Sequence, residues 1–343
     1  MPLGLVFCLV LILVNREGAT DSQPVHEVSP RTTPAPTTSS HQSRPPNETR
    51  ITALGVSAGG PDATASFERW LGRPVDLSHA FLPERTWGEI EVGAGWARWW
   101  GGSAYADRML ISVPMLPEDD PSATLALGAT GAYDAHFRAA AQQLVRHGMG
   151  NALLRIGWEF NRPSVRWAAR GAPSAYAAYF RHIVTAFRDV SPGFRFTWCP
   201  AAGYYGWDAR AAYPGDSYVD VISTDSYDAW FGRRSVTSDQ RWHFLVDGAG
   251  RPGGLQFWDR FATAHGKPTG FAEWGLQAVD LPGDPGPRGG GGDDPDYIGR
   301  MHEWAASHDV AFLCYFDRDG ADGAHRLSAG RFPRAAAQFL TLW

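Results

Sequence analysis

The sequence lacks the features that would point to several large classes of protein. Only three cysteines occur in 343 residues, too few for a framework of disulfides. The formal net charge is −5, so a nucleic-acid-binding surface is not expected. No cluster of histidine and cysteine indicates zinc or iron, and neither a metal nor another cofactor is expected.

Two further absences narrow the choice of enzyme class. No Gly-x-Gly-x-x-Gly follows the first expected strand, which weakens the case for a dinucleotide-binding protein. No lysine ends an expected strand, which disfavours an aldolase or another Schiff-base enzyme. Cys199 and Cys314 lie on separate expected strands and are predicted to be buried thiols, with a single bridge between them as the alternative.

The first fifty residues are predicted to stand apart from the folded part. The apolar run Leu3–Val14 has about the length of a signal-peptide core and is too short for a confident membrane span. Residues 1–19 are therefore expected to be a signal peptide or a membrane anchor. Residues 20–50 are rich in proline, serine and threonine and contain no aromatic residue, which predicts a disordered linker. Together they favour a secreted or cell-surface protein, either released or tethered through its N-terminus.

Residues 51–343 show the alternation of strands and helices that is typical of a (β/α)8 TIM barrel. The expected strands are Thr52–Ser57, Leu77–Phe81, Met109–Pro114, Ala152–Glu159, Arg195–Pro200, Val219–Asp225, Thr269–Trp274 and Ala311–Phe316. The clearer helices are Ala135–His147, Ala175–Asp189, Leu255–His265, Asp296–Ser307 and Arg334–Leu342. About eight such units fit a closed barrel better than an open doubly wound sheet.

Two glutamates end two of these apolar strands. Glu159 ends the fourth expected strand, and Glu273 lies at the end of the seventh. A carboxylate on a buried strand is costly unless it is paired or used. Because the active site of a barrel lies at the carboxyl ends of its strands, the pair predicts the two catalytic carboxylates of glycoside hydrolysis. A structural ion pair inside the barrel is the alternative.

Several segments together resemble glycoside hydrolase family 26, a family that contains β-mannanases. Arg155-x-x-x-Glu159-x-Asn161 resembles its acid/base motif, and Phe271-Ala272-Glu273-Trp274-Gly275 is similar to its nucleophile strand. Tyr213–Asp220, followed by Asp225-x-Tyr227, resembles its sixth strand, and Trp198-Cys199-Pro200 its fifth.

The resemblance implies a retaining mechanism on the barrel, with Glu159 as the acid/base and Glu273 as the nucleophile. Tyr227 would hydrogen-bond the nucleophile, while Arg155 and Asn161 would support the carboxylates or contact substrate. Trp158 stands where the family usually has histidine and is a candidate substrate contact, in the part of the site nearest the cleaved bond.

Other side chains near expected strand ends are candidate substrate contacts. Asp225 is expected to bind sugar hydroxyls, with loop capping as the alternative. His79 lies at the apolar second strand and is either a substrate contact or a core residue. Aromatic rings stack well on the apolar faces of sugars, so four tryptophans are candidates for stacking or, equally, for core packing. They are Trp167, Trp207, Trp230 and Trp274.

The expected function is a secreted retaining endo-β-glycanase that cleaves a polysaccharide by double displacement, without a cofactor and as a monomer. Mannan-type substrates are favoured, and β-glucan, xylan or a cell-surface polysaccharide are alternatives. A non-catalytic carbohydrate-binding barrel and an unrelated barrel enzyme such as an isomerase are the rivals. Residues 283–296 are expected to form a loop whose aspartates cap the next helix, rather than a metal loop or a lid.

Overall fold

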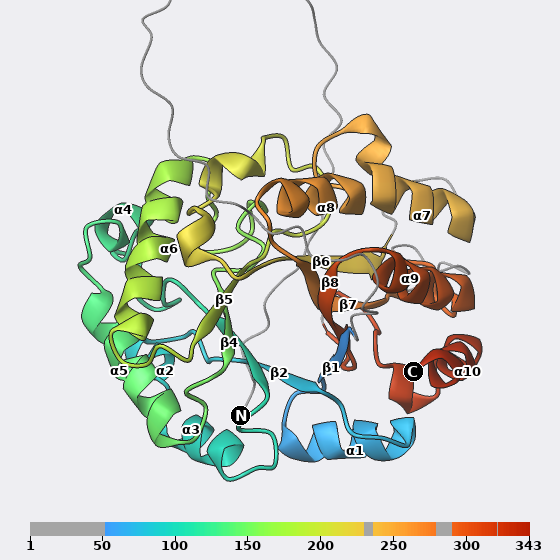
Figure 1. Cartoon of the computed structure of the whole chain (residues 1–343), viewed down its shortest axis with the longest axis horizontal. Helices are drawn as coiled ribbons and strands as arrows, with labels where there is room; N and C mark the ends of the chain where they lie inside the picture. Colours follow the sequence, from blue (N-terminus) through green and yellow to red (C-terminus); the bar gives the residue numbers. More distant parts are fainter. Residues whose placement is uncertain (1–51, 230–235, 279–289, 321) are drawn as a thin grey trace, which may run out of the picture.

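The computed structural model describes residues 52–229, 236–278, 290–320 and 322–343, and it confirms the predicted (β/α)8 barrel. The parallel strands follow one another in chain order, and β8 pairs with β1 to close the sheet (Figure 1). The strands are β1 (Ala53–Ser57), β2 (Leu77–Phe81), β3 (Met109–Val113), β4 (Leu153–Ile156), β5 (Arg195–Trp198), β6 (Val221–Asp228), β7 (Thr269–Leu276) and β8 (Val310–Phe316). The predicted signal and linker segments lie outside the described residues.

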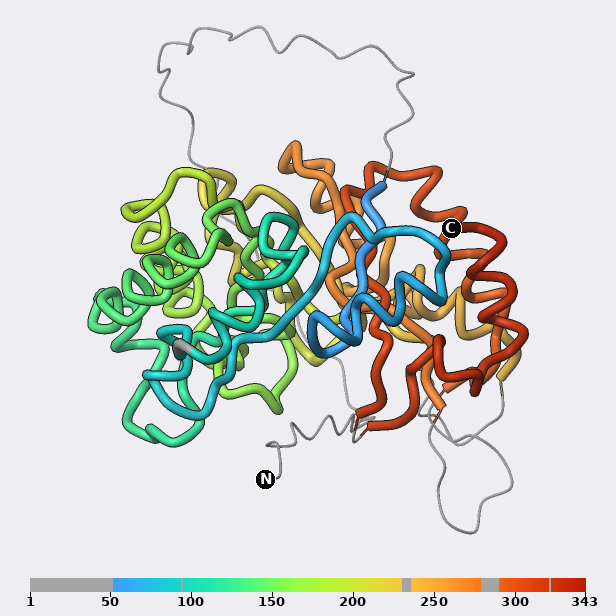
Figure 2. Tube along the Cα trace, turned by 90° about the horizontal axis from the view of Figure 1, so that it is seen from below, coloured from blue at the N-terminus to red at the C-terminus, as the bar shows by residue number. Residues whose placement is uncertain are grey.

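Helices surround this barrel (Figures 1 and 2). The α-helices are α1 (Pro61–Leu71), α2 (Trp87–Ile90), α3 (Ala94–Gly101), α4 (Leu125–Gly128), α5 (Asp134–Arg146), α6 (Pro173–Arg188), α7 (Ser238–Asp247), α8 (Leu255–Ala264), α9 (Pro295–Ser307) and α10 (Pro333–Leu342). Short 3-10 helices are η1 (Ala209–Ala212), η2 (Asp216–Tyr218), η3 (Gly248–Gly250) and η4 (Leu327–Ala329). Within the described ranges, no helix has the length and apolar character that crossing a membrane requires.

The start of α9 shows how local chemistry sets these elements. The Asp294 carboxylate accepts hydrogen bonds from the backbone of Asp296 and Tyr297, and Pro295 occupies the first turn. An acidic cap and an early proline both favour a helix start. This confirms the capping interpretation for the described end of the 283–296 segment. The part up to residue 289 lies outside the described residues.

Strand β4 is shorter than its apolar run predicted. It ends at Ile156, because Gly157 (φ 53°) and Glu159 (φ 52°) adopt left-handed backbone conformations that no strand accommodates. The backbone N–H of Glu159 instead donates to the carbonyl of Cys199, 2.8 Å away. Glu159 therefore lies in a turn just beyond the strand, where the sequence placed it at the strand end.

Apolar side chains fill the space between the strands and the helices. Trp198 on β5 and Trp274 on β7 are both fully buried. Cys199 and Cys314 are buried and free, which confirms the prediction of thiols. A Cβ at Gly55 would lie 2.3 Å from Cys314 Sγ, so glycine is what lets β1 lie against this side chain of β8.

Candidate active site

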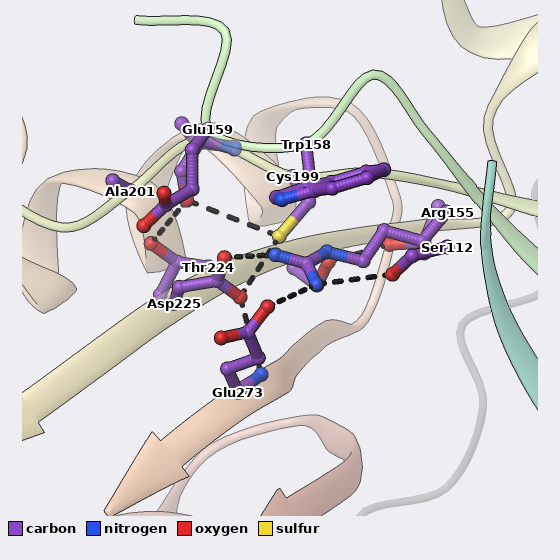
Figure 3. A network of polar contacts seen from close by, with 12 residues as sticks. Ser112, Arg155, Trp158, Glu159, Cys199, Ala201, Thr224, Asp225 and Glu273 are labelled. Carbon is purple, nitrogen blue, oxygen red and sulfur yellow. Dashed lines mark hydrogen bonds and ion pairs between the residues drawn. The ribbon is translucent and has the colours of Figure 1, made fainter. Parts of the chain in front are cut away.

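Arg155 on β4 is the central cation of the site (Figure 3). Its side chain is fully buried, and its Nη1 donates to Glu273 Oε1 at 2.5 Å and to Ser112 Oγ at 3.1 Å. Its Nη2 donates to Asp225 Oδ2. The planar fork of a guanidinium suits two carboxylates at once. Arg155 thus holds two carboxylates in place, so of its two predicted roles it has that of supporting the carboxylates. Its buried side chain does not face a substrate.

Glu273 has a hydrogen-bond donor at each carboxylate oxygen. Arg155 Nη1 donates to Oε1, and the Tyr227 hydroxyl donates to Oε2 at 2.8 Å. The predicted contact between Tyr227 and Glu273 is therefore present. Donors at both oxygens fix the orientation of the carboxylate. The side chain remains 11% exposed, enough for one face to meet a ligand.

Glu159 lies in a different environment. Its Oε2 accepts a hydrogen bond from Arg162 Nη1 at 2.7 Å, and its side chain is 13% exposed. Burial raises the pKa of Glu159, and the negative charge of Glu273 raises it further, while Arg162 and Arg155 oppose both effects. A raised pKa keeps a carboxyl group protonated, which a general acid requires.

The two glutamates belong to one site. Figure 3 shows Glu159 and Glu273 reaching it from different parts of the barrel, with Arg155 and Asp225 beside them. Glu159 comes from the turn after β4, and Glu273 comes from β7. The backbone N–H of Glu159 donates to the carbonyl of Cys199, whose Sγ lies 3.3 Å from Asp225 Oδ1. Asp225 Oδ1 in turn accepts from the backbone N–H of Glu273, so the two glutamates are linked through two intervening residues.

Asp225 and Asn161 have structural partners where substrate contacts were predicted. Asp225 is 3% exposed and accepts a hydrogen bond from the backbone N–H of Glu273 at 3.1 Å, besides pairing with Arg155. The Asn161 amide is 3% exposed and forms two hydrogen bonds with the backbone of Ala201, at 2.8 and 2.9 Å. Both side chains are buried and bond to neighbouring backbone. The assignment of Asp225 as a sugar contact is therefore wrong, and of the two roles predicted for Asn161 the contact with substrate is not seen.

Trp158 and Trp167 form a pair beside Arg155. Trp158 is 8% exposed, and the Arg155 Cζ lies 5.5 Å from its ring centre. Trp167 is 2% exposed, and its Nε1 donates to the Trp158 carbonyl at 2.7 Å. Trp167 therefore packs against Trp158 and bonds to its backbone. The prediction that Trp167 stacks on sugar is wrong. The predicted substrate contact of Trp158 stays a prediction.

Two more predicted contacts are buried away from any ligand. Trp274 follows Glu273 on β7, so its side chain points to the opposite face of the sheet, where it stacks on Phe339 of α10 with no exposed surface. His79 is also fully buried, and its Nε2 lies 2.8 Å from Ser112 Oγ. Burial and the Arg155 charge lower the pKa of His79 well below its usual value. Both substrate assignments are wrong, and Trp230 lies outside the described residues.

Sequence reasoning missed three residues that shape the site. Ser112 accepts from Arg155 and was signalled only by a lone hydroxyl on an apolar strand. Arg162, three residues after Glu159, was signalled by its place directly after the acid/base motif. His325 packs its ring 5.0 Å from that of Tyr227, and no pattern in the sequence linked the two.

The described residues contain no group of three or more histidine, cysteine or acidic side chains placed to hold a metal ion. The site combines the carboxyl groups of Glu159 and Glu273 with Asp225 and with the arginines that orient them. Burial raises the pKa of Glu159, and Glu273 has a donor at each oxygen. Such a pair suits acid/base and nucleophilic chemistry on one bond.

Comparison with known proteins finds similarity to a family of glycoside hydrolases. The sequence model of Glycosyl hydrolase family 26 matches residues 141–243, a range that contains Glu159 and ends before Glu273. Endoglucanase H of Acetivibrio thermocellus is 27% identical over 175 residues, which cover 48% of this chain and only 18% of that protein. The chain thus spans less than a fifth of that relative's length.

Solved structures of low sequence identity share the fold. The catalytic domain of the GH26 endo-beta-1,4-mannanase of Bacillus sp. JAMB-750 superposes with a TM-score of 0.55 at 16% identity, over 84% of this chain and 87% of that one. A Bacillus subtilis mannanase gives a TM-score of 0.52 at 15% identity, over 83% of each chain. The family match and the shared barrel confirm the predicted resemblance to glycoside hydrolase family 26 and the predicted (β/α)8 barrel.

Proposed function

We propose that this protein cleaves a β-linked polysaccharide by a retaining double displacement, with Glu159 as the acid/base and Glu273 as the nucleophile. One observation carries the proposal: the two glutamates share a site but have different surroundings. Glu273 has a donor at each oxygen, whereas burial raises the pKa of Glu159. Environments that separate two carboxyl groups in this way define an acid and a base.

In the first step, Glu159 gives its proton to the glycosidic oxygen while a Glu273 carboxylate oxygen attacks the anomeric carbon. The bond to the leaving sugar breaks, and a glycosyl ester forms on Glu273. In the second step, the Glu159 carboxylate takes a proton from water, which attacks the same carbon and releases Glu273. Retaining enzymes place the two carboxyl groups about 5–5.5 Å apart.

Arg155 and Tyr227 act on Glu273 throughout this sequence. Their donors hold its two oxygens in one orientation, so that one lone pair is directed at the anomeric carbon. They also stabilise the carboxylate that leaves when the ester is hydrolysed. Arg162 orients the Glu159 carboxyl group through Oε2.

For the substrate we propose a mannan-type β-glycan first and a β-glucan second. The first rests on solved structures whose names describe mannanases, and the second on a relative named endoglucanase. A panel of mannan, glucomannan, β-glucan and xylan, with product sizes measured over time, tests both and separates endo from exo cleavage. Saccharide binding without any product over days supports a non-catalytic carbohydrate-binding barrel instead.

We also propose that the protein is exported and works outside the cell as a monomer. The apolar run Leu3–Val14 and the composition of residues 20–50 support export. Fractionation of producing cells, with mass measurement of the N-terminus, distinguishes a released, a tethered and a retained protein. Light scattering of the purified chain tests the monomer.

A further inference from the structure

One guanidinium at the active-site rim has no anionic partner among the described residues. Arg318 follows β8, and its Cζ lies 4.9 Å from the ring centre of Phe81 and 4.7 Å from that of Phe316. These two aromatic rings end β2 and β8. Across the described ranges, no hydrogen bond or ion pair joins Arg318 to another residue. The rings therefore hold a positive charge in place without neutralising it.

Among the described residues, several other partly or fully buried arginines have carboxylate partners, and Arg181 donates to the carbonyl of Pro214. Arg155 pairs with Glu273, Arg162 with Glu159, and Arg241 with Asp228. Arg318 is half-buried, so its guanidinium is only partly hydrated. A partly desolvated cation held by aromatic rings retains its attraction for an anion, and a carboxylate matches its planar donors best.

Arg318 lies close to the proposed nucleophile. The Phe81 ring that contacts Arg318 also lies 5.9 Å from the Cζ of Arg155, which binds one oxygen of Glu273. The Phe316 ring lies 5.9 Å from the ring of Tyr227, which binds the other oxygen. A single aromatic ring thus separates Arg318 from each partner of Glu273.

The turn after β1 adds an apolar surface beside this charge. A Cβ at Gly59 would lie 3.9 Å from Arg318 Cδ, and a Cβ at Gly60 would lie 2.3 Å from the Trp99 ring. Gly60 therefore lets Trp99 pack against this turn, and Arg318 Cδ lies within ordinary contact distance of a Cβ at the neighbouring Gly59. Trp99 is 49% exposed. An exposed aromatic ring near a cation offers stacking for a sugar and a partner for its charge.

We propose that Arg318 binds the carboxylate of a uronic acid unit, so that a β-linked glycan carrying acidic units is preferred over its neutral counterpart. This inference rests on the proposed function, because it concerns the sugar bound next to Glu273. A neutral mannan offers Arg318 only hydroxyl groups, whereas a uronate offers two anionic oxygens. Charge-assisted hydrogen bonds are about twice as strong as neutral ones, so the preference is expected to be large.

The test compares a uronate-containing β-linked oligosaccharide with the same molecule after its carboxyl groups have been reduced to alcohols. Binding of both is measured to Glu159→Gln, whose neutral side chain resembles the protonated acid, and hydrolysis of both is measured with the wild type. Each measurement is repeated with Arg318→Gln and Arg318→Lys. The matched control is Arg326→Gln, which removes an exposed arginine from the same connection after β8.

We expect the acidic oligosaccharide to bind about 10- to 100-fold more tightly than its reduced form, the range of a hydrogen bond to a charged group. Arg318→Gln should abolish that difference without weakening the reduced form, Arg318→Lys should keep part of it, and Arg326→Gln should keep it all. Equal affinity for both forms, or an equal loss for both in Arg318→Gln, overturns the inference. Selective binding with no hydrolysis of either form overturns the proposed function alone.

Discussion

Arg155 on β4 and Glu273 on β7 are 118 positions apart in the sequence and 2.5 Å apart between Nη1 and Oε1. The same guanidinium also pairs with Asp225 of β6. One cation therefore ties three strands together beneath the proposed reaction centre. Both its positioning role and its contribution to stability can be measured.

Arg155→Met is expected to lower the free energy of unfolding by about 3–5 kcal/mol, because it leaves two buried carboxylates without a cation. Methionine is unbranched and flexible enough to fill the space of the side chain. Urea unfolding at neutral pH measures the loss. Arg326→Met, an exposed arginine, is the control and should change stability by less than about 0.5 kcal/mol. A similar small change in Arg155→Met would contradict the central role of this cation.

Tyr227→Phe is expected to lower kcat/KM by about 10- to 100-fold, because a hydrogen bond to the charged Glu273 is lost. The ring still packs against His325 and Phe316, so Tm should change little. Tyr297→Phe is the matched control, since its hydroxyl donates to the backbone carbonyl of Ser226. Equal losses of activity in the two variants would remove the specific role of Tyr227.

Glu159→Gln and Glu273→Gln should both lose activity on a polysaccharide but differ in their activity on an aryl glycoside. Loss of the acid/base is expected to lower turnover of a polysaccharide by about 10²–10⁴-fold. With an activated aryl glycoside, whose leaving group needs no proton, Glu159→Gln should still release the aryl group, whereas Glu273→Gln should not. Initial rates on both substrates measure this. Release of the aryl group by Glu273→Gln and not by Glu159→Gln would reverse the two assignments.

The pH dependence should report on Glu159. Activity requires its protonated form, so kcat/KM should fall on the alkaline side as this group ionises, at a pH above the usual range of a carboxyl group. Arg162 lowers the pKa of Glu159, so Arg162→Gln should raise that pKa and move the alkaline limb to higher pH. A full pH profile of kcat/KM measures the shift. A limb that moves to lower pH would contradict this assignment.

Substitutions of Trp274 and Trp158 should distinguish a side chain that packs the core from one that binds the oligosaccharide. Trp274→Ala is expected to destabilise the fold by about 3–5 kcal/mol, the usual cost of removing a large buried aromatic side chain. Oligosaccharide affinity of the folded fraction should stay unchanged. Trp158→Ala should instead weaken that affinity, because its ring lies over Arg155 at the site. Calorimetric titration after a check of folding distinguishes the two results.

The barrel was predictable because its signal is repeated along the chain. Apolar runs and amphipathic stretches alternated often enough to specify eight units, and the five clear helices were placed within two residues of their observed ends. The end of β4 was not predictable from hydrophobicity, because an apolar turn packed over the barrel has the same composition as a strand. Gly157 was the one signal for that turn.

The site was predicted in part for similar reasons. Glu159, Glu273 and the Tyr227 contact followed from motifs, which preserve order along the chain. Trp274 was misplaced although the alternation of a strand, with Glu273 facing inward, implied an outward side chain. The burial of His79 and Trp167 depends on neighbours from other strands and loops, and no local pattern carries that information.

The anomeric configuration of the first product tests the central claim most directly. Proton NMR during hydrolysis of a β-linked oligosaccharide resolves the two anomers before mutarotation mixes them. We expect the β-anomer to appear first, because displacement by Glu273 followed by displacement by water retains configuration. First appearance of the α-anomer would mean a single displacement by water and would contradict the assignment of Glu273 as the nucleophile.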